Sequence, residues 1–175
     1  MTNSPSAKML VLVGDRFACV RIVGRANFTS SVDFKTLVNE LRQKGFSWFI
    51  LDLSECMLMD STFLGVLTGF GLKMNPESGD GSIELLNANA RITELLENLG
   101  VLHLFKMTQG AFNQSACPES MAHTPVSPTK EETTRACLEA HRTLMDVNPA
   151  NVQRFKDVTQ FLAEDLKRMK NGATS

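Results

Sequence analysis

The hydrophobic positions of the first hundred residues fall into short runs with two different spacings. Continuous apolar runs rich in Val, Ile, Leu and Phe are typical of β-strands, whereas apolar residues three or four positions apart are typical of helices. Runs of the first kind occupy residues 9–13, 17–23, 46–53, 83–86 and 101–105. Helical spacing separates the last four runs, and the sequence therefore predicts the order β-β-α-β-α-β-α-β for residues 8–107.

This order predicts an α/β fold with a mixed, mostly parallel β-sheet. Two strands joined through a single helix need a crossover connection, which places them parallel in one sheet with the helix packed on it. Only the turn Gly14-Asp15-Arg16 separates the first two runs, so we expect them to form an antiparallel hairpin at the edge of the sheet.

Polar residues that favour helix N-termini precede the predicted helices of this domain. Ser30 or Ser31 is expected to cap the first helix, and Asn87 or Asn89 the third. The second helix follows a short loop at residues 59–62.

The composition changes beyond this region. Residues 108–129 are rich in Ser, Thr, Pro and Asn and lack a sustained apolar period, so we expect a linker. Residues 130–171 carry two amphipathic helical stripes, the first opened by a possible capping box of Thr129 and Glu132. The sequence therefore predicts a main domain at residues 1–107, a linker and a C-terminal two-helix extension.

The two C-terminal helices are expected to form a helical hairpin, with Asn148-Pro149 at the start of the second helix. A hairpin cannot bury both apolar stripes alone, so it must pack on the main domain, on a second copy of the chain or on a partner. A homo-oligomer through these helices is therefore one expected arrangement. The stripes consist of Cys137, Leu138, His141, Leu144 and Met145, and of Val152, Phe155, Val158, Phe161, Leu162, Leu166 and Met169.

Composition and charge exclude several classes of function. The formal net charge of −1 gives no general reason to bind nucleic acid or an anionic membrane, and no apolar run approaches the roughly 20 residues of a spanning helix. The N-terminus lacks the pattern of a secretory signal, and the four cysteines form no CxxC pair. We therefore expect a cytoplasmic protein without membrane insertion.

Residues 50–73, ILDLSECMLMDSTFLGVLTGFGLK, are the stretch around which this domain is organised. They predict a buried strand, a short loop and an apolar helix, with Ser61 and Thr62 at the helix start. A hydroxyl there can cap the helix, act as a nucleophile or accept a phosphate, since the helix dipole favours negative charge at this end. Spacing alone favours simple capping by Asp60 or Ser61. On the helix itself, Gly65 and Gly69 would let another backbone approach closely.

Catalysis is the least supported of these uses, and no catalytic residue is assigned. A serine nucleophile needs a base, and His103, His123 and His141 each have the position of a surface or packing residue. A serine hydrolase with Ser61 as nucleophile is kept as a rival interpretation. The sequence also has no metal-ligand spacing and no nucleotide-binding motif, so no metal or cofactor is expected.

Residues 59–65, MDSTFLG, resemble the signature of the STAS domain, and more narrowly that of the bacterial anti-sigma factor antagonists. LDLSECMLM before them and VLTGFGLK after them extend the resemblance, which covers residues 8–107 in the strand and helix order derived above. Its specific part is the Asp-Ser-Thr core at residues 60–62.

The resemblance implies a regulator without enzymatic activity. In such proteins a serine-kinase anti-sigma factor phosphorylates the serine of this core, which is Ser61 here, with Thr62 as the second choice. The unphosphorylated form binds the kinase and frees a sigma factor, and a PP2C-type phosphatase restores it. The implied partner-binding residues are Met59, Asp60, Ser61, Thr62 and Phe63.

Phe63 departs from the family pattern, because many members have glycine there. Its ring either packs inward or projects into the docking surface. The alternative function is a STAS scaffold or accessory subunit of a stress-signalling or lipid-transport assembly, not switched by phosphorylation. In that case the C-terminal helices would carry assembly.

Overall fold

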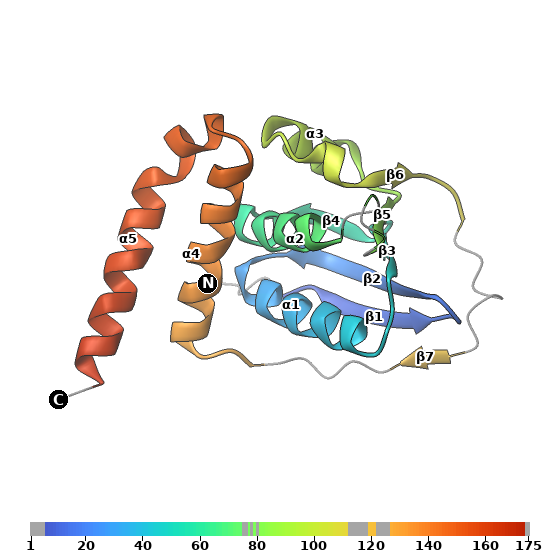
Figure 1. Ribbon diagram of the computed structural model, residues 1–175, viewed down its shortest axis with the longest axis horizontal. Helices are drawn as coiled ribbons and strands as arrows, with labels where there is room; N and C mark the ends of the chain where they lie inside the picture. The colour runs from blue at the N-terminus through green and yellow to red at the C-terminus, as the bar shows by residue number, and fades with distance from the viewer. Residues whose placement is uncertain are drawn as a thin grey trace.

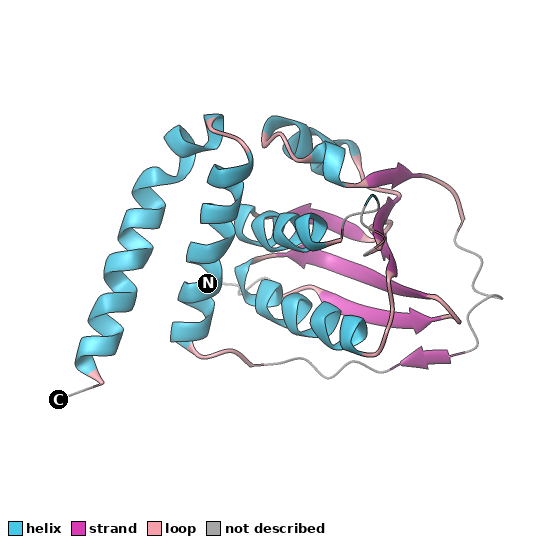
Figure 2. Cartoon of the chain, viewed as in Figure 1, coloured by secondary structure: helices cyan, strands magenta, loops and turns pink. Residues whose placement is uncertain are grey.

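The computed structural model describes residues 6–74, 77, 79, 81–111, 119–121 and 127–173. Figure 1 shows a β-sheet with helices packed on it and a separate pair of long helices at one end. Figure 2 shows that this end is entirely helical, whereas strands and helices alternate in the rest of the chain.

The sheet is mixed and mostly parallel, as predicted. Its strands follow the order β6-β5-β3-β2-β1-β7, and β4 pairs with β2 outside this path. Among the described strands, only the pairs β1–β2 and β1–β7 are antiparallel. The predicted hairpin therefore exists, but β7 rather than β1 forms the edge. The strands are β1 (Lys8–Val13), β2 (Phe17–Ala26), β3 (Trp48–Asp52), β4 (Cys56–Met59), β5 (Ser82–Leu86), β6 (Lys106–Thr108) and β7 (Glu119–Met121).

Three helices of the main domain contribute to one hydrophobic core on one face of the sheet, and two further helices form the C-terminal pair. Helix α4 lies against α2 and α1, and α5 packs on the outer side of α4 (Figure 1). The C-terminal helical hairpin therefore folds back on the main domain of the same protein chain. The helices are α1 (Phe28–Gln43), α2 (Ser61–Lys73), α3 (Ala90–Asn98), the 3-10 helix η2 (Leu102–Leu104), α4 (Lys130–Val147) and α5 (Ala150–Gly172).

Aromatic side chains fill the core between the sheet and its first two helices. Phe34 of α1 lies 4.9 Å from Phe63 of α2, and Phe70 of α2 lies 4.9 Å from Phe49 of β3, measured between ring centroids. All four rings are buried. This cluster fixes α1 and α2 to each other and to the centre of the sheet.

Two predicted elements differ from the structure. The loop expected after β3 contains the strand β4, which pairs with residues 24–26 of β2. Residues 101–105, expected to be a strand, contain the 3-10 helix η2 instead, and the last parallel strand begins at Lys106. Val101 and Phe105 are both buried while His103 is exposed, and this four-residue spacing suits a helical turn better than a strand.

Helix starts follow the predicted chemistry, with one correction. Asn27 caps α1 in place of Ser30 or Ser31, and Ser30 instead completes a capping box by accepting the Asn27 N–H. The other choices are confirmed, because Asn89 caps α3 and Thr129 forms a capping box with Glu132 at α4.

The C-terminal stripes are only partly buried. Helix α4 buries Leu138, His141 and Leu144, but α5 leaves Val152, Val158 and Phe161 exposed. Of the predicted linker, residues 112–118 and 122–126 lie outside the described residues, and residues 119–121 form β7. Among the helices that the structure describes, none is long and apolar enough to cross a membrane.

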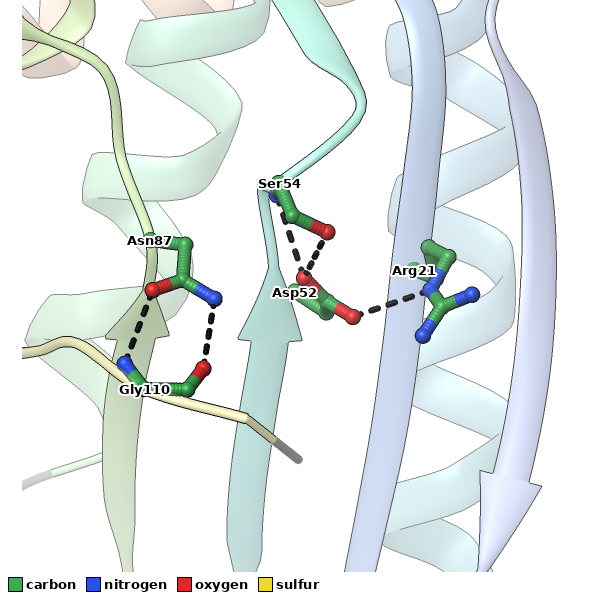
Figure 3. A network of polar contacts seen from close by, with 5 residues as sticks. All are labelled: Arg21, Asp52, Ser54, Asn87 and Gly110. Carbon is green, nitrogen blue, oxygen red and sulfur yellow. Dashed lines mark hydrogen bonds and ion pairs between the residues drawn. The ribbon is translucent and has the colours of Figure 1, made fainter. Parts of the chain in front are cut away.

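Two sets of polar contacts lie at the C-terminal ends of β3 and β5 (Figure 3). Asp52 accepts hydrogen bonds from the Ser54 backbone N–H and hydroxyl and from Arg21 Nε. Asn87, in a left-handed conformation with φ 58°, pairs its side-chain amide with the backbone N–H and carbonyl of Gly110. Burial opposes ionisation of Asp52, but the bonds from Ser54 and Arg21 outweigh it and lower its pKa below the ordinary value.

Replacing Asp52 with asparagine is expected to lower the free energy of unfolding at pH 7 by about 1–3 kcal/mol, because charge-assisted bonds to a buried carboxylate are lost. The ordinary pKa of an aspartate is about 3.9, and that of folded Asp52 is lower. The stabilisation by Asp52 is therefore complete above about pH 3.9, the ordinary pKa of an aspartate, and it is lost as the pH falls through the lower pKa of the folded state. Urea unfolding between pH 3 and 7 measures the difference. Glu84→Gln is the control, and an equal loss in both variants at all pH values would contradict this role of Asp52.

Candidate functional site

The candidate site lies where β4 passes into α2. Asp60 is the N-cap of α2, and its Oδ1 accepts the Phe63 N–H at 2.8 Å. Its Oδ2 accepts the Phe28 N–H at 2.7 Å, so one carboxylate joins the starts of α1 and α2. Burial raises the pKa of Asp60, while these backbone bonds and the nearby His141 act in the opposite direction. Asp60 therefore shapes this junction.

Ser61 is the first residue of α2 and is half-buried. Its Oγ lies 2.9 Å from Nε2 of His141, which comes from α4. The other ring nitrogen, Nδ1, lies 2.6 Å from the carbonyl oxygen of Cys137. A carbonyl only accepts hydrogen bonds, so Nδ1 carries a proton, and in the neutral ring Nε2 accepts the bond from the Ser61 hydroxyl. The Ser61 hydroxyl is therefore engaged by a side chain of α4.

The other predicted site residues face inward. Thr62 is buried, and its hydroxyl lies 3.6 Å from the Cys137 sulfur, a weak bond to α4. Met59 is buried, and so is Phe63, whose ring packs against Phe34. The Phe63 ring therefore packs inward and does not project into a docking surface. Ser61 is thus more accessible than Met59, Thr62 or Phe63.

Helix α4 approaches α2 very closely at Gly65 but not at Gly69, which lies on the same face. A Cβ atom added to Gly65 would lie 2.4 Å from the carbonyl oxygen of Ala140, far inside van der Waals contact. A Cβ atom added to Gly69 would have Thr143 Cγ2 as its nearest neighbour, at 3.9 Å. The predicted backbone approach therefore takes place at Gly65, where α4 makes it, whereas Gly69 has only a side-chain methyl of α4 as a neighbour.

Contacts of α4 differ along its length. Over α1, Glu139 forms an exposed ion pair with Lys35 at 3.0 Å. Near its C-terminal end, Asn151 of the following helix donates to the carbonyls of Leu99 and Leu144 at 2.9 and 2.8 Å, and Asn151 is fully buried. Buried amide bonds are costlier to break than exposed ion pairs. The end of α4 near α5 is therefore the firmly held end.

Of the two candidate histidines that the structure describes, His141 lies at Ser61 and His103 does not. His103 is exposed at η2, and His123 lies outside the described residues. His141 is buried in the helical stripe, where a packing role was expected, but its bond to Ser61 was not predicted. Eighty residues separate the two side chains, and no local pattern in the sequence links them. Within the described part of the chain, no three His, Cys, Asp or Glu residues gather as a metal site.

Comparison with solved structures identifies the fold of the main domain. SpoIIAA, an anti-sigma factor antagonist solved in its unphosphorylated form, matches with a TM-score of 0.50 at 15% identity, over 63% of this chain and 94% of its own. A putative anti-sigma factor antagonist from Thermotoga maritima matches with a TM-score of 0.52 at 22% identity, over 57% and 85%. An anti-sigma factor antagonist from Mycobacterium paratuberculosis matches with a TM-score of 0.52 at 16% identity, over 63% and 91%.

These likenesses are to proteins under 25% identical and show the fold alone. No curated protein matches the chain at a significant level. The sequence itself is more informative, because a family model described as the STAS domain matches residues 8–111. That match spans more than half of the chain and includes β4, Asp60 and Ser61, so the protein belongs to the STAS domain family.

Proposed function

We propose that this protein is an anti-sigma factor antagonist switched by phosphorylation of Ser61. The observation that carries the proposal is the position of Ser61 as the first residue of α2, directly after a capping aspartate. A phosphate adds a charge of about −1.5 to −2 at pH 7. The free N–H groups and positive dipole end of the helix stabilise such a charge. The fold can therefore carry the modified residue.

The unphosphorylated protein binds a serine-kinase anti-sigma factor in the cytoplasm and thereby releases a sigma factor, and a PP2C-type phosphatase reverses the modification. Met59, Thr62 and Phe63 contribute by holding the junction in shape, since all three are buried. Asp60 fixes the backbone on either side of the acceptor through its bonds to Phe28 and Phe63. The partner reads the surface around Ser61, and the protein itself catalyses no reaction.

Incubation with a serine-kinase anti-sigma factor and ATP is expected to place one phosphate on Ser61, as measured by peptide mass mapping. Thr62 is 5% exposed, so its hydroxyl is a much poorer acceptor. Thr62→Ala should therefore leave the modification in place, whereas Ser61→Ala should abolish it. Phosphate that persists in Ser61→Ala, or a chain that never accepts phosphate, would contradict the proposal.

One observation favours the alternative of a scaffold or accessory subunit. Val158 and Phe161 lie three residues apart on α5, and both are exposed, with Phe161 59% accessible. Such side chains suit assembly with a second copy or another protein. In that case the kinase experiment would leave Ser61 unmodified, so the same measurement separates the two functions.

The contact between Ser61 and His141 has the distance of a nucleophile and its base. A catalytic histidine is usually oriented by a carboxylate, whereas Nδ1 of His141 is held by a carbonyl of its own helix. The groove between α1, α2 and α4 is lined by residues such as Val66, Lys73 and Thr143 and includes neither Ser61 nor His141. The arrangement therefore suits a closed packing contact better than a hydrolase site.

A further inference from the structure

The surface on which the proposed switch depends is covered by the chain itself. Helix α4 lies along α2, with Cys137 over Thr62, Ala140 over Gly65 and His141 over Ser61. These contacts begin at the first residue of α2 and extend one turn along it. A protein partner that reads Ser61 would need the same side of the helix that α4 occupies.

The contact with His141 also engages the acceptor atom. Phosphoryl transfer requires the phosphate donor close to Oγ and in line with it, at about 3–3.5 Å. One side of Oγ is already filled by Nε2 at 2.9 Å, within hydrogen-bond distance. His141 is 5% exposed and packs against Phe155 of α5 at 5.0 Å between ring centroids, so the ring has little room to turn away. Access to Ser61 therefore requires movement of α4.

Among the described residues, the polar contacts that hold α4 over this site are few and weak. They are the Ser61–His141 bond, the long Thr62–Cys137 contact and the exposed Lys35–Glu139 pair. An exposed ion pair of this kind contributes about 0–1 kcal/mol. The firm polar anchor, Asn151 on the Leu99 carbonyl, lies beyond the C-terminal end of α4. Release of α4 from α2 must in addition expose apolar side chains of α4 that are now buried, Leu138 and Ala140 among them, while the Asn151 bond keeps the far end attached.

From this arrangement we propose that α4 is an intramolecular cover of the Ser61 site, and that α4 and the kinase compete for the same face of α2. The proposal rests on the function proposed above and adds its regulation. In the covered form Ser61 neither accepts phosphate nor meets its partner. Binding and phosphorylation proceed from the uncovered form, so the apparent affinity for the kinase falls by the fraction of molecules that are uncovered.

The two glycines of α2 provide a matched pair of variants. Gly65→Ala introduces a methyl group that collides with the Ala140 backbone, whereas Gly69→Ala adds one at an ordinary contact distance from Thr143. Both substitutions favour the helix by a similar amount, roughly 1 kcal/mol. Only the first should displace α4. Ala140→Leu enlarges the same contact from the α4 side and leaves α2 unchanged, which covers the case in which Gly65→Ala fails to fold.

Two readouts on the full chain test the cover. Alkylation of Cys137 by N-ethylmaleimide, followed by peptide mass mapping, reports release of α4 without any kinase. The Cys137 side chain is partly buried where α4 meets Thr62 of α2, and burial raises its thiol pKa, so the covered form reacts slowly. The rate of phosphate incorporation at Ser61 reports access to the acceptor. We expect both rates to rise about tenfold or more in Gly65→Ala and Ala140→Leu, and to change less than about twofold in Gly69→Ala.

Each result separates the cover from the proposed function. Faster alkylation of Cys137 without faster phosphorylation of Ser61 would overturn the cover and leave the phosphoswitch intact. Equal alkylation in folded Gly65→Ala, Gly69→Ala and the unmodified chain would also overturn it. Faster alkylation with no phosphate on Ser61 in any variant would contradict the phosphoswitch itself and, with it, the regulation that the cover adds.

Discussion

Replacing Phe63 with alanine is expected to lower the free energy of unfolding by about 3–5 kcal/mol. The ring is fully buried and lies 4.9 Å from the ring of Phe34, so its removal leaves a cavity between α1 and α2. Surrounding side chains cannot fill such a space without moving the helices, because packed cores relax only in part. Urea unfolding monitored by circular dichroism measures the loss.

The matched control is Phe161→Ala, which removes the same ring from the surface of α5, where it is 59% exposed. Its effect should stay within about 0.5 kcal/mol. Glycine at position 63, the residue that the family resemblance leads one to expect, should cost more than alanine, since glycine adds up to about 1 kcal/mol within a helix. Equal losses in Phe63→Ala and Phe161→Ala would contradict the inward position of Phe63.

The sequence predicted the parts of the fold that depend on local spacing. The apolar run at residues 46–53 led to the central strand β3, and Thr129 with Glu132 led to the start of α4. Strand β4 was missed because it has only four residues, and its pairing with β2 depends on a chain segment thirty residues earlier. The 3-10 helix at residues 102–104 was missed because LHL between buried residues has no distinctive local pattern.

The sequence predicted the residues that α2 contributes to the site, but not those that α4 contributes. Asp60 and Ser61 were identified because a cap and a hydroxyl at a helix start have a local signature. Gly65 and Gly69 indicated that some backbone approaches α2, but their spacing carries no information about which backbone it is. The answer, Ala140 and His141 of α4, depends on how the hairpin folds over the main domain. Contacts of this kind arise from tertiary packing and leave no pattern in either segment.

The cover gives the proposed switch a charge-based consequence at the junction itself. In the unmodified protein, the Ser61 hydroxyl is bonded to His141, and the Asp60 carboxylate accepts hydrogen bonds from the Phe28 and Phe63 N–H groups. A phosphate on Ser61 replaces the hydroxyl hydrogen and adds anionic oxygens where Nε2 of His141 now lies 2.9 Å from Oγ. It also brings a second negative charge next to Asp60. A partner that binds over the modified serine must therefore desolvate the phosphate charge beside the Asp60 carboxylate, and this desolvation costs binding free energy.

Phosphorylation of Ser61 is accordingly expected to weaken binding of the serine-kinase anti-sigma factor by roughly a hundredfold, which corresponds to about 3 kcal/mol. Titration calorimetry with the phosphorylated and unphosphorylated full chain measures this ratio. Ser61→Ala removes the hydroxyl without adding charge and should bind at least as well as the unmodified chain, because it also loses the bond to His141. If Ser61→Ala lost as much affinity as the phosphorylated chain, the hydroxyl itself would be the contact that the partner reads. Charge would then not be the basis of the switch.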